Sequence, residues 1–129
     1  MSFEEGLFQY LDDHAGLSMQ VDSRIYPVKL PQNAIFPAVT YTRIATPLLH
    51  ELDTTTLLPH PTFQFDCWSE SYARAKDVAA QVFIALDMYR GAMGAYTVEA
   101  SIVSTERDTI DPETNVWHTM IDVEIWYEV

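Results

Sequence analysis

Residues 63–91 constrain the fold more than any other stretch, because an alternating segment leads directly into a long amphipathic one. In residues 63–68 every second side chain belongs to one set, and this period of two is typical of a strand. One face of that strand carries Phe63, Phe65 and Cys67. The sequence therefore predicts a sheet whose core face includes these three side chains.

A long helix is predicted directly after this strand. Apolar residues recur at spacings of three and four, which places them on one side of a helix: Ala75, Val78, Ala79, Val82 and Leu86. Ser69 or Ser71 can cap its first turn, since a serine oxygen accepts a bond from a free backbone N–H. Gly91 is the expected residue just past its end, because glycine enters the left-handed region without a Cβ penalty. We expect the other elements to pack on this strand and helix.

The first third of the chain predicts a helix followed by extended segments. Ser2 and Glu5 form a capping-box pattern, so a helix is expected to begin there and to end near residues 12–16. Residues 17–22 fit a helical turn or a loop equally well. Prolines keep the next stretch out of a helix, and Ile25 with Tyr26 can add a short edge pairing before a strand at residues 38–44.

The last third predicts an antiparallel hairpin. Residues 96–107 alternate as a strand, with Val98, Ala100 and Ile102 on one face. Residues 108–116 contain turn-forming residues, so Arg107 and Asp108 are expected to have a structural role at the hairpin turn. Residues 117–129 alternate most regularly and predict the second strand of the hairpin. Its outer face carries His118, Met120, Asp122, Glu124, Trp126 and Glu128.

The fold class that follows is α+β. We expect a mainly antiparallel sheet of about four strands, with an N-terminal helix and one long helix packed on it. The length of 129 residues fits one domain over residues 1–129.

The charge balance limits the kinds of partner. The chain has 19 acidic and 7 basic residues, a formal net charge of −12. A large phosphate-binding surface needs clustered Lys and Arg, so specific DNA binding is not expected. An acidic wall would suit a channel through which DNA slides without adhering.

Cysteine and hydropathy patterns predict a protein of a reducing compartment. Cys67 is the only cysteine and is interpreted as a buried small hydrophobe rather than a nucleophile. Residues 1–10 contain no basic residue, which does not fit a signal peptide. No apolar run approaches the roughly 20 residues that a membrane span needs. We therefore expect a cytoplasmic site of synthesis and no membrane contact.

Two features indicate contact with other chains. Residues 45–61 form a connection much longer than the about two to five residues of an ordinary hairpin loop. It is rich in leucine, and the candidate contact residues there are Leu48, Leu49, Leu57 and Leu58. The second feature is Met120 and Trp126 on the outer face of the last strand. Both remain open at this stage, because the leucines can also fold back over the domain's own core, and a helix can also cover that strand face.

No catalytic constellation stands out. The string His50-Glu51-Leu52-Asp53 begins like a zinc-protease motif, but Thr54 occupies the position of the second histidine. His118 and Asp122 lie on either side of Met120 on the outer face and are interpreted as a surface contact. The chain has no G-x-S-x-G motif and no glycine-rich phosphate loop. We expect no catalytic, metal or cofactor site.

Several short segments, in order and at matching spacings, carry a family likeness. They span nearly the whole chain: Arg24 to Pro27, Leu30 to Gln32, Pro37 to Tyr41, Gln64 to Trp68 with Ser71, Tyr72, Ala75 and Leu86, Glu106 to Asp108, and Asp122 to Tyr127. In these segments the chain resembles a tail completion family, which joins tails to heads in long-tailed bacteriophages and prophages.

The resemblance implies a structural virion protein without catalysis. It implies a small α+β subunit that assembles with itself into a ring, a hexamer, at the head-proximal end of the tail tube. Such a ring would end tube polymerisation, offer a surface to the head-tail connector and let DNA pass through its lumen. It would be built in the host cytoplasm and would reside in the neck of the virion.

Two other functions compete with this one. A head-completion or stopper subunit of the connector would occupy the neighbouring position in the same particle. A small cytoplasmic hydrolase or metal-dependent enzyme would use His50, Asp53 and His60. Bound zinc, or an activity lost on His60→Ala, would favour the enzyme.

Overall fold

The structure is a computed structural model, and it describes residues 2–46 and 60–128. The described residues form three helices: α1 (Phe3–Asp12), α2 (Ala15–Val21) and α3 (Tyr72–Leu86). They also form six strands: β1 (Ile25–Pro27), β2 (Ala38–Ala45), β3 (Thr62–Ser69), β4 (Gly91–Met93), β5 (Tyr96–Ile110) and β6 (Trp117–Glu128).

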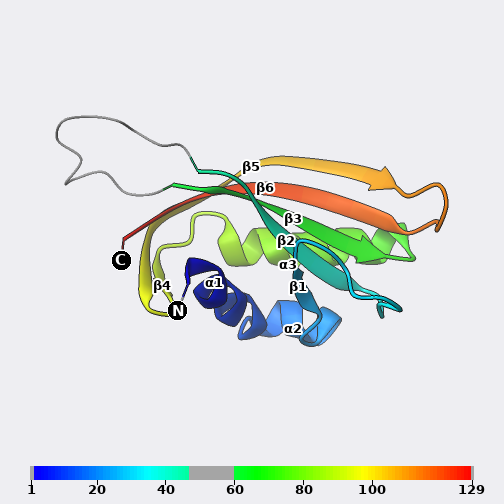
Figure 1. Ribbon diagram of the computed structural model, residues 1–129, viewed down its shortest axis with the longest axis horizontal. Helices are drawn as coiled ribbons and strands as arrows, with labels where there is room; N and C mark the ends of the chain where they lie inside the picture. The colour runs from blue at the N-terminus through cyan, green and yellow to red at the C-terminus, as the bar shows by residue number, and fades with distance from the viewer. Residues whose placement is uncertain (1, 47–59, 129) are drawn as a thin grey trace.

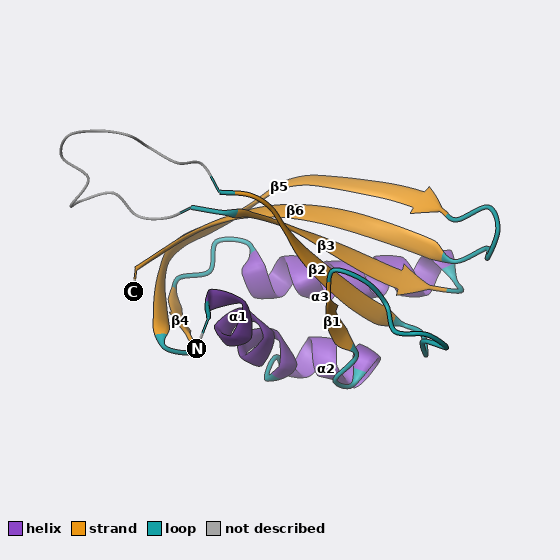
Figure 2. Ribbon diagram, viewed as in Figure 1, coloured by secondary structure: helices purple, strands orange, loops and turns teal. Residues whose placement is uncertain are grey.

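The strands form one curled sheet in the order β1-β2-β3-β6-β5-β4, with all three described helices on one side of it (Figures 1 and 2). The α+β class is confirmed, but the expected sheet of about four antiparallel strands is wrong in detail. The sheet has six strands over the described residues, and β1 pairs with β2 in parallel. The edge strand β1 confirms the short edge pairing expected at Ile25 and Tyr26, whereas β4 at the other edge was not expected, and it has three residues. Three residues are too few to produce a clear period of two in the sequence.

The strand and helix of residues 63–91 occupy the centre, as predicted. β3 pairs with β2 on one side and with β6 on the other. Phe63, Phe65 and Cys67 are fully buried on the face that α3 covers. Burial raises the pKa of the Cys67 thiol well above its ordinary value, which fits a structural rather than a reactive cysteine.

The predicted start of α3 is confirmed, but the predicted residue at its C-terminal end is wrong. Ser71 caps the first turn, and its hydroxyl accepts a bond from the Arg74 N–H at 3.4 Å. At the other end Met88, with φ +61°, takes the left-handed position that we expected for Gly91. Gly91 instead begins β4. The Asp87 carboxylate accepts a bond from the Val103 N–H at 3.1 Å, so it fixes the end of the helix to the edge of β5.

Helices α1 and α2 fill the space between α3 and the sheet edges. Ser2 caps α1 by accepting from the Glu5 N–H at 3.2 Å, as the capping box predicted. Residues 17–22, which were open between helix and loop, belong mainly to α2. Phe3 stacks on Tyr127 of β6 with ring centroids 4.0 Å apart, which joins α1 to the last strand.

Strand β5 corrects two expectations. It continues to Ile110, so Arg107 and Asp108 lie within the strand, and the turn falls at residues 111–116. A register shift between Val98 and Ala100 also breaks the predicted common face. Val98 faces the core, whereas the next two members of the set, Ala100 and Ile102, face outward. An inserted residue of this kind cannot be located from alternation alone.

Candidate interaction surfaces

One face of the sheet carries none of the described helices, and we call it the open face (Figure 1). Cross-strand register places the following side chains on it: Thr40, Thr42, Gln64, Asp66, Trp68, Ala100, Ile102, Thr105, Arg107, His118, Met120, Asp122, Glu124 and Trp126. Along β6 these positions are half-buried and alternate with buried core positions. Some of these side chains pack on one another, as the contacts of Trp68 with His118 and of Arg107 with Asp122 show.

Met120 and Trp126, the two candidate interface residues on the last strand, both lie on the open face. Trp126 stacks on His60 with ring centroids 5.4 Å apart and an interplanar angle of 8°. The Met120 sulfur accepts from Nη2 of Arg107 at 3.9 Å. Both side chains are half-buried. The sequence left open whether a helix covers this face. None of the helices among residues 2–46 and 60–128 does so.

A network of charges and amides crosses the middle of the open face. Nη1 of Arg107 lies 3.2 Å from Oδ2 of Asp122, and the Thr105 hydroxyl donates to the same oxygen at 2.9 Å. Nε2 of Gln64 donates to Oδ1 of Asp66 at 2.8 Å. Burial raises the pKa of Asp66 above its ordinary value, despite that hydrogen bond.

His118 and Asp122 lie four residues apart on β6, and each contacts a different partner. The His118 ring packs on Trp68, with centroids 4.1 Å apart, and Trp68 donates from Nε1 to the Thr40 hydroxyl at 3.0 Å. Asp122 pairs with Arg107. Within the described part of the chain, Nδ1 of His118 and Oδ1 of Asp122 are buried and have no hydrogen-bond partner. The geometry is that of a packed surface, without a base aligned on a nucleophile.

A second candidate surface lies on α3, and the sequence analysis did not predict it. Residues 78–86 contain one polar side chain, Gln81, yet one side of this stretch of the helix is exposed to solvent. Phe83 is 43% exposed, Ile84 63% and Met88 78%. We call these three residues, together with exposed Ala80, the α3 patch. The signal was present, because a helix that is apolar on every side normally contacts other protein on every side.

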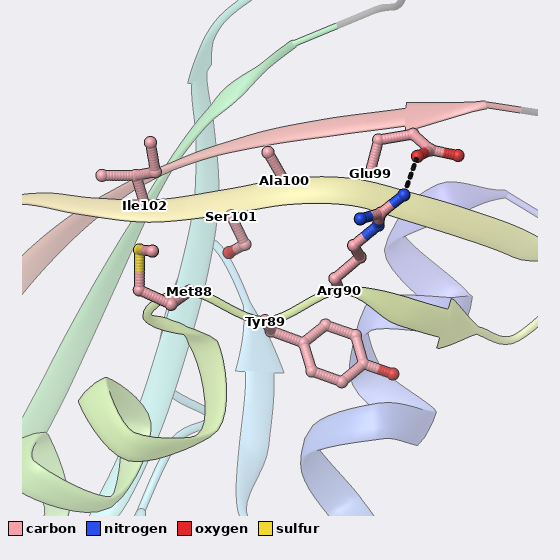
Figure 3. A pocket seen from close by; sticks show the side chains of 7 residues that line it. All are labelled: Met88, Tyr89, Arg90, Glu99, Ala100, Ser101 and Ile102. Atoms are coloured by element: carbon pink, nitrogen blue, oxygen red, sulfur yellow. Dashed lines mark ion pairs between the residues drawn. The ribbon is translucent and has the colours of Figure 1, made fainter.

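A shallow pocket of about 190 Å³ extends the α3 patch toward β5 (Figure 3). Its lining runs along the segment after α3 and the facing edge of β5: Met88, Tyr89, Arg90, Glu99, Ala100, Ser101 and Ile102. Met88 donates its N–H to the Ser101 carbonyl at 2.7 Å, which holds this segment against the strand. Arg90 and Glu99 lie 3.7 Å apart and neutralise each other. The pocket is thus an apolar recess beside one ion pair.

The remaining sequence candidates lie outside the described residues: Leu48, Leu49, Leu57, Leu58, His50 and Asp53. Of the third enzyme candidate, His60, the structure shows the contact with Trp126. In residues 2–46 and 60–128 there is no group of three or more His, Cys, Asp or Glu side chains that could hold a metal ion. None of the described helices is both long and apolar enough to cross a bilayer.

Comparison with known proteins gives the class and then the family. The chain has the same fold as a chain of a solved structure described as the virion of the native gene transfer agent (GTA) particle. The TM-score is 0.73 at 15% sequence identity, covering 95% of this chain and 92% of that one. The family described as Tail completion protein gp17 matches residues 5–128. No curated protein sequence matches. The chain therefore belongs to the tail completion protein gp17 family, a family of structural phage tail proteins.

Proposed function

We propose that this chain forms a ring, a hexamer, at the head-proximal end of a phage or prophage tail. There it ends polymerisation of the tail tube and joins the tail to the head. Membership of the tail completion family over residues 5–128 carries this proposal. Its partners would be further copies of itself, the tail tube protein and the head-tail connector or stopper protein. It would reside in the neck of the virion after assembly in the host cytoplasm.

The open face supports self-assembly. A ring of identical subunits requires two different surfaces on each subunit that fit each other. Met120 and Trp126 place apolar area on a face that lacks a helix among the described residues. Apolar area that is rimmed by polar groups is characteristic of protein interfaces. The leucines at positions 48, 49, 57 and 58 would contribute to contacts between subunits or with the tube.

The charge of the chain supports a passive channel for DNA. With 7 basic residues against 19 acidic ones, a ring of several copies would be strongly acidic. Four of the seven cations are already held by carboxylates: Arg43, Lys76, Arg90 and Arg107. Few charges remain to hold a phosphate backbone, so DNA would pass through the lumen without specific binding.

Electron microscopy of a lysate from the parent phage, with this gene disrupted, tests the proposal. We expect filled heads separate from tails, and tails of abnormal length, because nothing would end the tube or link it to the head. Expression of the intact gene from a plasmid should restore joined particles. This complementation is the control for effects on neighbouring genes.

Two other results would contradict the tail-terminating role. Tails of normal length beside heads that leak DNA would indicate the head-completion or stopper subunit instead. Intact infectious particles would overturn a role in tail completion for this chain. Native mass spectrometry of the purified protein tests the ring separately, and a hexamer is the expected species.

A further inference from the structure

The structure assigns a partner to the α3 patch: we propose that it packs on the open face of the next copy of this chain. This rests on the proposed ring and names the two surfaces that would form each contact. The α3 patch is defined above as Ala80, Phe83, Ile84 and Met88. The receiving surface is the part of the open face around Met120 and Trp126.

The first argument is the composition of α3. Its buried side is already complete, because Ala75, Val78 and Val82 are fully buried against the sheet. Ile84 and Ala80 lie on the opposite side of the helix, where charged side chains are the usual choice. Between Asp77 and Asp87 the helix carries no charge at all. Such a surface would be stabilised by transfer from water to a protein contact.

The second argument is the one-sided cover of the sheet. All three described helices lie on one side, so the helical layer and the open face are back to back (Figure 2). The helical layer of one copy could therefore serve as the second cover for the sheet of the next. Because the two surfaces are different and face in opposite directions, the contact is heterologous. Such a contact closes into a ring when the rotation from one copy to the next divides a full turn, and otherwise gives an open filament.

The third argument is charge. Arg74 near the start of α3 is exposed and has no ion-pair partner among the described residues. Arg90 beyond its end is 78% exposed and has a long 3.7 Å contact with Glu99. These cations lie on either side of the α3 patch. The open face offers carboxylates, among them Glu124, which forms none of the ion pairs of the described residues. In a chain of net charge −12, the unpaired Arg74 and the exposed, loosely paired Arg90 beside an apolar patch favour an acidic partner such as another copy.

Paired cysteines test this contact directly. Cys67 is buried and stays unreactive, so new cysteines can be placed in the otherwise unchanged chain. Ile84→Cys marks the α3 patch, and Met120→Cys marks the open face. With a short bis-maleimide, we expect the double variant to give a ladder of covalent multimers. A mixture of the two single variants should give cross-linked dimers.

Each single variant alone is the matched control and should give no cross-link. Dimers from Ile84→Cys alone would mean that two α3 patches meet, and dimers from Met120→Cys alone would mean that two open faces meet. Either result overturns the proposal. Rings without cross-links in the double variant overturn this pair of surfaces while leaving the ring intact. A chain that is monomeric at every concentration overturns the proposed contact between copies. The phenotype of the disrupted gene then tests the role in tail completion independently.

Charge insertion gives a second, independent measurement. Ile84→Asp places a charge in the α3 patch, and we expect the apparent dissociation constant of the oligomer to rise about tenfold or more. Met19→Asp is the control, because Met19 is 86% exposed on α2 and lies outside the patch. Both variants should fold, as judged by circular dichroism. Equal dissociation constants for the two variants would overturn the role of the α3 patch.

Discussion

The Asp108 carboxylate in β5 forms hydrogen bonds to both β6 and α3. Its Oδ1 accepts from the Thr119 hydroxyl at 2.8 Å and from Nζ of Lys76 at 3.3 Å. Its Oδ2 accepts from the Tyr72 hydroxyl at 3.2 Å. Desolvation works to raise the pKa of Asp108, but these hydrogen bonds outweigh it and hold the pKa below its ordinary value. The sequence predicted a structural role for this residue but placed it at a turn.

We predict that Asp108→Asn destabilises the fold at neutral pH by about 1 kcal/mol, because charge-assisted bonds become neutral ones. A carboxyl whose pKa is lowered on folding stabilises the protein above its unfolded pKa of about 4, and this contribution is lost as the pH falls through the folded value. The difference between wild type and variant should therefore shrink below about pH 4. Urea unfolding at a series of pH values measures it.

Glu113→Gln is the control for this experiment. It makes the same change in net charge at an exposed position in the turn of residues 111–116. Its stability should follow that of the wild type at each pH. A difference for Asp108→Asn that is equal at pH 7 and pH 3 would show that the Asp108 charge does not contribute.

At the scale of the elements, the close approach of α1 to β4 fixes one edge of the molecule. A Cβ added at Gly6 would lie 2.5 Å from the carbonyl oxygen of Met93 in β4. Real Cβ atoms do not approach a backbone oxygen so closely. Gly6 is thus required by packing rather than by backbone conformation, and it allows the helix to lie directly on the short strand.

We predict that Gly6→Ala destabilises the protein by about 1–2 kcal/mol, although alanine is the better helix former by about 1 kcal/mol. The helix or the strand would have to shift to relieve the contact. Urea unfolding followed by circular dichroism measures the change. Gln9→Ala, at an exposed position of α1, is the control and should be neutral. A stabilised Gly6→Ala variant would mean that α1 is free to move away from β4.

At the scale of the whole molecule, the open face and the α3 patch both leave apolar side chains without a covering helix or strand among the described residues. A one-sided sheet with half-buried aromatic residues on its other face is common, and so is an exposed leucine or methionine. The combination with a charge-free helix on the opposite side is what favours assembly. The two surfaces differ from each other, as a heterologous contact between copies requires.

We predict that Trp126→Asp leaves the monomer folded but weakens assembly by about tenfold or more, because a charge replaces a large aromatic side chain of the open face. The size distribution in sedimentation velocity measures assembly, and circular dichroism measures folding. Ile35→Asp, at a site that is 67% exposed in the link between β1 and β2, is the control. An oligomer profile unchanged by Trp126→Asp would refute its assignment to an interface.

Local patterns in the sequence were sufficient for the centre of the fold. The alternation at Phe63, Phe65 and Cys67 and the helical spacing from Ala75 to Leu86 each repeat several times, so a single period explains them. The caps at Ser2 and Ser71 depend on bonds three residues away and were also within reach. The family resemblance could be identified for a related reason, since it depends on several short segments that follow one another in the family's order and spacing.

Tertiary structure alone decided where the sheet ends and which surfaces remain uncovered. A strand as short as β4 forms because a neighbouring strand offers hydrogen bonds, and the register shift between Val98 and Ala100 leaves the period of two only locally disturbed. The exposure of Ile84 likewise depends on which side of α3 the sheet occupies. The sequence by itself determined the elements that repeat a pattern, because their physics is local. Which faces remain for a partner was decided by the packing of elements that lie far apart in the chain.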